Sequence, residues 1–142
     1  MSEEIKALVR RWYDTHQPGR VAEAEAMCSE DFRGHMAGMP EPIDRNQFKQ
    51  MAAMFFTAFS EIEQTVDDQL AEGDKVASRG NWRARHTGEF QGILATDRLV
   101  TMRWMGVDRI ADGKIAEHWA YLDMLSVLRQ IGPMAGAEAS AA

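Results

Sequence analysis

Cysteine is almost absent from the sequence, since Cys28 is the only one among 142 residues. A single cysteine cannot form an internal disulfide bond, which excludes a secreted scaffold held together by disulfides. Cys28 falls in a predicted short helix from about Val21 to Cys28, and the sequence indicates no histidine or lysine beside it. We therefore interpret it as a buried, unreactive thiol rather than a catalytic one.

Positive charge is also scarce: 16 Lys and Arg residues stand against 22 Asp and Glu residues, for a net charge of −6. Nothing resembles a basic stripe for phosphate backbones, so no nucleic acid partner is expected. No apolar run reaches the length of about 18 residues that a membrane-spanning helix needs, and no signal-peptide pattern occurs. We therefore expect no membrane association and a cytoplasmic location.

Patterns that bind metals or nucleotides are missing too. The four histidines are dispersed, no pair of histidines or cysteines has the spacing of metal ligands, and no glycine-rich loop could cradle a phosphate. We expect neither a metal nor an organic cofactor.

What is present indicates one globular domain. Hydrophobic residues make up 45% of the chain and charged residues 27%, which is ordinary usage for a folded domain of this length. We predict a single domain over residues 1–132, followed by an Ala-rich tail over residues 133–142.

Helical patterns come first along the chain. Apolar residues recur on one face of an N-terminal helix, and His16 falls on that face one turn after Trp12. Asp44 and Gln47 have the spacing of a capping box, and an amphipathic helix with an aromatic face follows them.

Strand patterns dominate the second half. Residues 29–33 are predicted to turn into a brief extended segment, and three or four strands are predicted between Glu61 and Leu122. The strongest hairpin signal is Asp112-Gly113, because both residue types tolerate the dihedral angles of a tight turn. A short helix, Met124–Ile131, closes the pattern. This order predicts an α+β fold in which helices cover one face of a strongly curved sheet.

Several segments carry a family resemblance: His86–Ile93, Arg109–Ile115, Glu117-His118-Trp119, Asp123, Leu128–Gly132 and, nearer the N-terminus, Ser29–Phe32 with His35. Together they resemble SnoaL-like polyketide cyclases, which belong to the nuclear transport factor 2-like superfamily with ketosteroid isomerase. The resemblance implies a cone-shaped, mostly antiparallel sheet with helices on its concave face, one deep apolar pocket and a homodimer.

The resemblance also implies cofactor-free chemistry. In these cyclases an aspartate at the position matching Asp123 acts as general acid and base in an intramolecular aldol ring closure. Two features depart from the family pattern: Leu94–Asp97 replaces a Pro-Ala-Thr-Gly turn, and Arg109 stands where the aromatic polyketide cyclases tend to carry a histidine.

The candidate catalytic residues are Asp123, His86, His118 and Arg109. Asp123 directly precedes a short helix, so it is also a candidate N-cap. Strict alternation places Trp119, Tyr121 and Asp123 on one face of the last strand, and His118 would share their face only through a bulge. Large aromatic residues and adaptable methionines suit a pocket for a flat hydrophobic ligand, although ordinary core packing uses the same residues. The candidate substrate-binding residues are His35, Trp12, Phe55, Phe59, Trp82, Trp104, Trp119 and Tyr121.

Three hypotheses follow. The first is a cyclase or isomerase that uses Asp123 to move a proton next to the carbonyl of a small hydrophobic or polycyclic compound. The second is an epoxide hydrolase or hydroxylase of the same fold, which requires Arg109 to pair with a carboxylate in the pocket. The third is a non-catalytic module, either a ligand carrier or a dimeric interaction domain, in which Asp123 caps the helix outside the pocket and methionines fill the interior.

Overall fold

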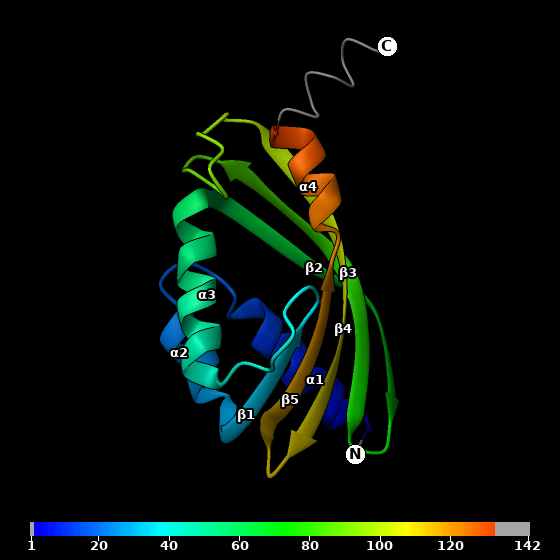
Figure 1. The fold of residues 1–142 in the computed structure, drawn as a ribbon. Coiled ribbons are helices and arrows are strands. Elements are labelled where there is room, and N and C mark those ends of the chain that lie inside the picture. The colour runs from blue at the N-terminus through cyan, green and yellow to red at the C-terminus, as the bar shows by residue number, and fades with distance from the viewer. Residues whose placement is uncertain (1, 133–142) are drawn as a thin grey trace.

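The computed structural model describes residues 2–132, so the predicted tail lies outside the described residues. Two helices, a strand and a third helix come first, four strands then follow one another, and a helix ends the described chain (Figure 1). The elements are α1 (Ser2–Asp14), α2 (Val21–Ala26), β1 (Cys28–Met36), α3 (Arg45–Ala58), β2 (Phe59–Glu72), β3 (Lys75–His86), β4 (Leu99–Ala111), β5 (Lys114–Leu122) and α4 (Met124–Ile131).

The five strands form one mixed sheet in the order β1-β5-β4-β3-β2. β1 pairs with β5 in parallel, whereas the other three pairs are antiparallel. The sheet curves strongly, and α3 lies opposite its concave face (Figure 1). Because α3 contacts both edge strands, β1 and β2, it closes the open side of the curved sheet. The predicted α+β class and curved sheet are confirmed.

Local signals placed two features correctly. The Asp44 side chain accepts a hydrogen bond from the Gln47 backbone and the Gln47 side chain accepts one from the Asp44 backbone, so the capping box that starts α3 is confirmed. Asp112 and Gly113 both have positive φ angles, of 50° and 72°, and form the turn between β4 and β5. A two-residue turn of this kind matches the twist of an antiparallel pair.

The segment around Cys28 differs from the prediction. The short helix ends at Ala26, and Cys28 is the first residue of β1, a strand that runs through to Met36. The reason is tertiary: β1 gains its hydrogen bonds from β5, a partner that lies far away in sequence. Cys28 is nonetheless buried, and burial, as the main cause, raises the pKa of its thiol to about 12, which keeps it protonated and unreactive.

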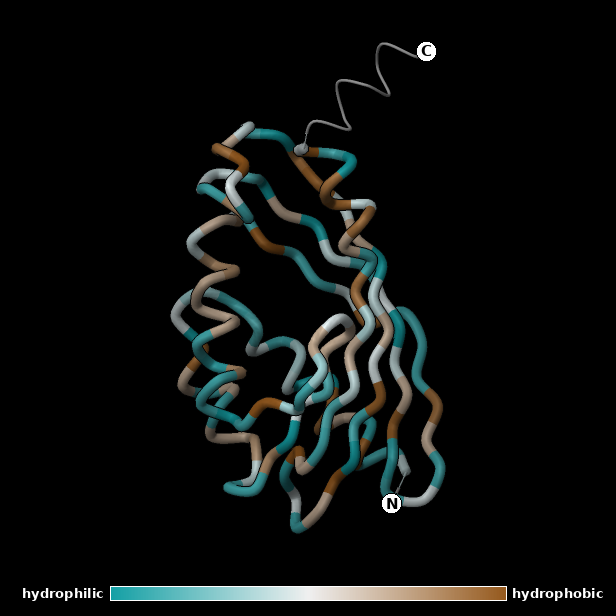
Figure 2. Tube along the Cα trace, in the orientation of Figure 1, coloured by the Kyte–Doolittle hydropathy of each residue, from teal (hydrophilic) through white to brown (hydrophobic). Residues whose placement is uncertain are grey.

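Alternation along the strands decides what faces the interior. Every second residue of β4 from Val100 to Ile110 is buried, and its neighbours are more exposed. Figure 2 shows the matching alternation of hydrophobic and hydrophilic residues along the strands. Two buried positions on that face carry no apolar side chain, because they are occupied by Gly106 and Asp108. Among residues 2–132, no helix is long and apolar enough to cross a membrane.

Candidate active site

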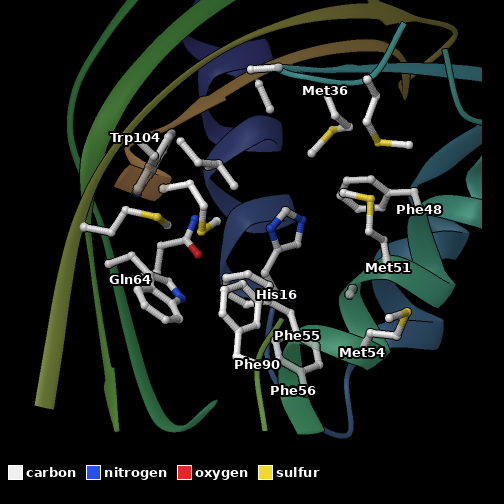
Figure 3. Close-up of a pocket in the computed structure, with 18 of the residues that line it drawn as sticks. His16, Met36, Phe48, Met51, Met54, Phe55, Phe56, Gln64, Phe90 and Trp104 are labelled. Atoms are coloured by element: carbon white, nitrogen blue, oxygen red, sulfur yellow. The ribbon is translucent and has the colours of Figure 1, made fainter. Parts of the chain in front are cut away.

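A cavity of about 590 Å³ lies between α3 and the concave face of the sheet. Its volume falls in the range of about 300–1,000 Å³ that is usual for small-molecule sites. Seven of the ten methionines line it, together with aromatic side chains from α3, β3 and β4 (Figure 3). The methionines are Met36, Met39, Met51, Met54, Met102, Met105 and Met124, and the aromatic residues from these elements are Phe48, Phe55, Phe56, Trp82 and Trp104.

Charged groups are nearly absent from the wall of this cavity. None of the described residues that line it is lysine or arginine, and the carboxylate among them is that of the exposed Glu89. The buried or half-buried polar residues of the wall are Tyr13, His16, Gln64 and His118. The cavity therefore suits an uncharged, largely apolar ligand that carries a few hydrogen-bonding oxygens.

His118 is held in the cavity wall by a buried chain of hydrogen bonds. Its Nδ1 lies 2.6 Å from Oδ1 of Asp108, and the hydroxyl of Tyr13 donates to Oδ2 of Asp108 at 2.7 Å. Asp108 is fully buried, and Tyr13 and His118 are nearly so. Because a carboxylate can only accept hydrogen bonds, Asp108 fixes the proton of neutral His118 on Nδ1 and leaves Nε2 unprotonated. Burial first, and Asp108 second, raise the pKa of Tyr13 well above its ordinary value, so Tyr13 stays a donor.

The sheet register brings these groups together. Asp108 of β4 pairs directly with His118 of β5, and both side chains point to the concave face. The next inward pair along the two strands is Gly106 with Ala120. A Cβ atom on Gly106 would lie 2.6 Å from the Tyr13 hydroxyl, so the glycine leaves the space through which Tyr13 of α1 reaches Asp108.

His16 is the second histidine of the cavity. It follows the end of α1 and packs edge-on against Trp12, with ring centroids 4.7 Å apart. Burial, and to a lesser extent the charge of His118, lower the pKa of His16 to about 3, so its ring is neutral at physiological pH. Its Nε2 is enclosed and has no hydrogen-bond partner among the described residues.

Asp123 lies outside the lining of the cavity. It is exposed, and its carboxylate accepts a hydrogen bond of 3.2 Å from the backbone of Ser126, which makes it the N-cap of α4. The structure thus places Asp123 in the capping position that its sequence context allowed, and the cavity is lined by its neighbours Leu122 and Met124 instead.

Arg109 and His35 meet on the other face of the sheet. Arg109 Nε lies 3.2 Å from Oε1 of Glu117, and His35 Nε2 lies 2.7 Å from Oε2 of the same carboxylate. The His35 ring stacks on Trp119, with centroids 5.2 Å apart. Burial opposes ionisation of Glu117, but hydrogen bonds from His35 and Arg109 outweigh it and lower the pKa of Glu117. None of these four residues lines the cavity.

The remaining predicted site residues lie in the cavity wall, in the core or at the surface. Phe55, Trp82 and Trp104 line the cavity. Trp12, Phe59 and His86 are fully buried in the core without lining it, and Tyr121 is 65% exposed. The His86 Nδ1 accepts from the Thr96 backbone at 3.2 Å, which ties β3 to the loop that follows it.

Three polar residues of the cavity wall were missed from the sequence, Tyr13, His16 and Gln64, and so was Asp108, which holds His118 from behind the wall. For Asp108 a signal was available, since it is the one charged residue on the buried face of a clearly alternating strand. Within residues 2–132, no group of three or more His, Cys, Asp or Glu side chains is arranged to hold a metal ion.

Comparison with known proteins agrees with this fold. Residues 6–131 match the family of the SnoaL-like polyketide cyclase. This match spans most of the chain, and the chain therefore belongs to the SnoaL-like polyketide cyclase family.

Named relatives are cyclases from Streptomyces. The chain is 28% identical over 135 residues to the aklanonic acid methyl ester cyclase DnrD of Streptomyces peucetius, covering 93% of this chain and 92% of that one. It is 30% identical over 92 residues to the nogalonic acid methyl ester cyclase of Streptomyces nogalater, covering 60% of this chain and 64% of that one.

Solved structures share the fold. AclR from Streptomyces galilaeus superimposes with a TM-score of 0.84 at 24% identity, covering 92% of this chain and 97% of that one. Wild-type IdmH from Streptomyces antibioticus gives a TM-score of 0.79 at 27% identity, covering 89% of this chain and 96% of that one.

Proposed function

We propose that the protein is a cyclase that closes a ring in a flat, uncharged, polycyclic carbonyl compound, with His118 as its general base. The observation that carries the proposal is the 2.6 Å contact between His118 Nδ1 and the buried Asp108, at the wall of the cavity. The relatives named as methyl ester cyclases support the same reaction class.

His118 suits the removal of a carbon-bound proton. Asp108 orients the imidazole and stabilises the cation that forms when Nε2 takes up a proton. Tyr13 donates to the second oxygen of Asp108, which keeps the carboxylate hydrogen-bonded throughout. A positioned base of this kind contributes about 10²–10⁴-fold to the rate of proton transfer.

The reaction needs no co-reactant. His118 takes a proton from the carbon next to one carbonyl, and the resulting enolate carbon forms a bond to a second carbonyl carbon of the same molecule. The oxygen of that second carbonyl then takes the proton back from His118. Substrate and product are isomers, and His118 ends in its starting state.

The cavity supports an uncharged substrate. Its described lining has no lysine or arginine to pair with a carboxylate, and the protein as a whole carries a net charge of −6. A substrate acid would therefore have to be esterified, as in the compounds after which the relatives are named.

The other two hypotheses have less support. The hydrolase hypothesis requires Arg109 to pair with a carboxylate in the cavity, but Arg109 pairs with Glu117, which does not line the cavity. The hypothesis of a non-catalytic module agrees with the capping role of Asp123. It also requires an interior filled by methionines, whereas the methionines line a cavity of about 590 Å³.

The proposal is tested with 2-tetralone, a flat bicyclic ketone with acidic protons next to its carbonyl. Exchange of these protons for deuterium is followed by proton NMR. We expect the protein to accelerate exchange over buffer, and His118→Gln to slow it by about 10²-fold or more. Asp123→Asn is the matched control, because asparagine also caps helices well, and it should keep the wild-type rate. Absence of acceleration, or a loss in Asp123→Asn with none in His118→Gln, would refute the assignment.

A further inference from the structure

The two cavity histidines share their surroundings. The Trp12 ring lies 4.7 Å from the His16 ring and 4.9 Å from the His118 ring, centroid to centroid. Phe48 lies 5.7 Å from His16 and 5.8 Å from His118. Both imidazoles therefore face the cavity from one aromatic cluster, although one follows α1 and the other belongs to β5.

The two histidines differ in the hydrogen-bond partners of their ring nitrogens. His118 is anchored by Asp108, which prepares it to carry a positive charge. His16 has no such anchor, and its Nε2 is enclosed without a partner in the described chain. Nδ1 of His16 is not among these enclosed atoms and the residue lines the cavity, so Nδ1 is the nitrogen through which the ring can reach a ligand. Figure 3 shows the His16 ring at the centre of the cavity lining.

The positive charge that His118 acquires as a base also affects His16. When His118 takes up a proton, its positive charge disfavours a second imidazolium nearby, which adds to the effect of burial on His16. A neutral imidazole can still donate one hydrogen bond, and neutral donors are effective at an oxygen on which negative charge develops.

We propose that His16 forms the oxygen-binding subsite of the cavity, donating a hydrogen bond to the ketone or ester carbonyl whose neighbouring carbon loses its proton to His118. This inference rests on the proposed function and adds the group that stabilises the enolate. It makes His16 a catalytic residue in contact with the ligand, and it defines the ligand as one that presents a neutral carbonyl or enol oxygen to the aromatic cluster.

The test compares two probes that differ by one oxygen. 2-Naphthol resembles a planar enol, and naphthalene has the same rings without the hydroxyl. Binding of each is measured by fluorescence titration to the wild type, His16→Phe and His16→Gln, after circular dichroism has confirmed their folding. Phenylalanine keeps a ring against Trp12 and Phe48, and glutamine keeps an N–H donor without titrating.

We expect His16→Phe to weaken 2-naphthol by about five- to tenfold, as for the loss of one neutral hydrogen bond. Naphthalene should change less than twofold, and His16→Gln should recover part of the 2-naphthol affinity. Equal losses for both probes, or no loss for either, would overturn the inference while leaving the proposed function intact. If the wild type binds neither probe, both the inference and the proposed function fail.

Discussion

Replacing Gly106 by alanine should disturb the buried chain of hydrogen bonds without replacing any of its members. The new Cβ would lie 2.6 Å from the Tyr13 hydroxyl and 3.2 Å from the carbonyl oxygen of Trp119, so the hydroxyl has to move. Asp108 then loses one of its two partners while it stays fully buried. A buried group left unsatisfied costs about 1–3 kcal/mol, and a glycine replaced by alanine within a strand recovers about 0.5–1 kcal/mol. We expect a net loss in the free energy of unfolding of up to about 2.5 kcal/mol.

A double-mutant cycle separates this effect from general crowding. Tyr13→Phe removes the hydroxyl that the new methyl group meets, so Gly106→Ala should cost nothing, or stabilise slightly, in that background. Urea denaturation of the four proteins gives the free energies, and unchanged slopes would confirm that only stability differs. Additivity of the two substitutions within about 0.5 kcal/mol would refute the reasoning, because it would mean that Gly106 is not small for the sake of Tyr13.

Two further predictions concern pH. His16 binds a proton in the unfolded chain below its ordinary pKa but not in the folded one until about pH 3, so the wild type loses stability as pH falls from about 6.5. His16→Phe should reduce the loss between pH 7 and 4.5 by about 2 kcal/mol in urea titrations, and parallel curves would contradict the burial of a neutral His16. The folded pKa of Glu117 is lowered, so its stabilising effect is present above the unfolded pKa and disappears as pH falls through the folded one. Glu117→Gln should therefore destabilise the protein more at pH 7 than in acid; an equal cost at both would count against the contacts with His35 and Arg109.

Short-range patterns were enough to predict the fold class and most of its elements, but not all of them. The capping box at Asp44 and the Asp112-Gly113 turn depend on neighbouring residues, and both formed as expected. The segment at Cys28 was mistaken for helix because its strand partner, β5, lies far along the chain. Local propensity cannot register such a partner, and tertiary pairing overrides it.

The candidate site was harder to predict because alternation does not say which face of a strand points inward. The alternation of β5 itself was predicted, but Trp119 and Tyr121 were taken to face the pocket. Pairing with β4 turns His118 and Ala120 inward instead. Register and sheet curvature fix this choice, and a shift of one residue exchanges the two faces. The charged Asp108 among the buried residues of β4 carried the missing information, since a buried carboxylate requires partners within reach.

Two small residues, Gly106 and Ala120, lie next to His118 on the concave face. Gly106 and Ala120 pair side by side on the concave face, directly next to the pair Asp108 and His118. A Cβ on Gly106 would lie 2.6 Å from the Tyr13 hydroxyl and 3.5 Å from Cε1 of His118, so the glycine leaves room for Tyr13 beside the His118 ring. Ala120 lines the cavity with a single methyl group. The glycine gives Tyr13 access to Asp108, and Asp108 orients His118. The chemistry we propose thus depends on two residues, Gly106 and Ala120, that contribute by being small.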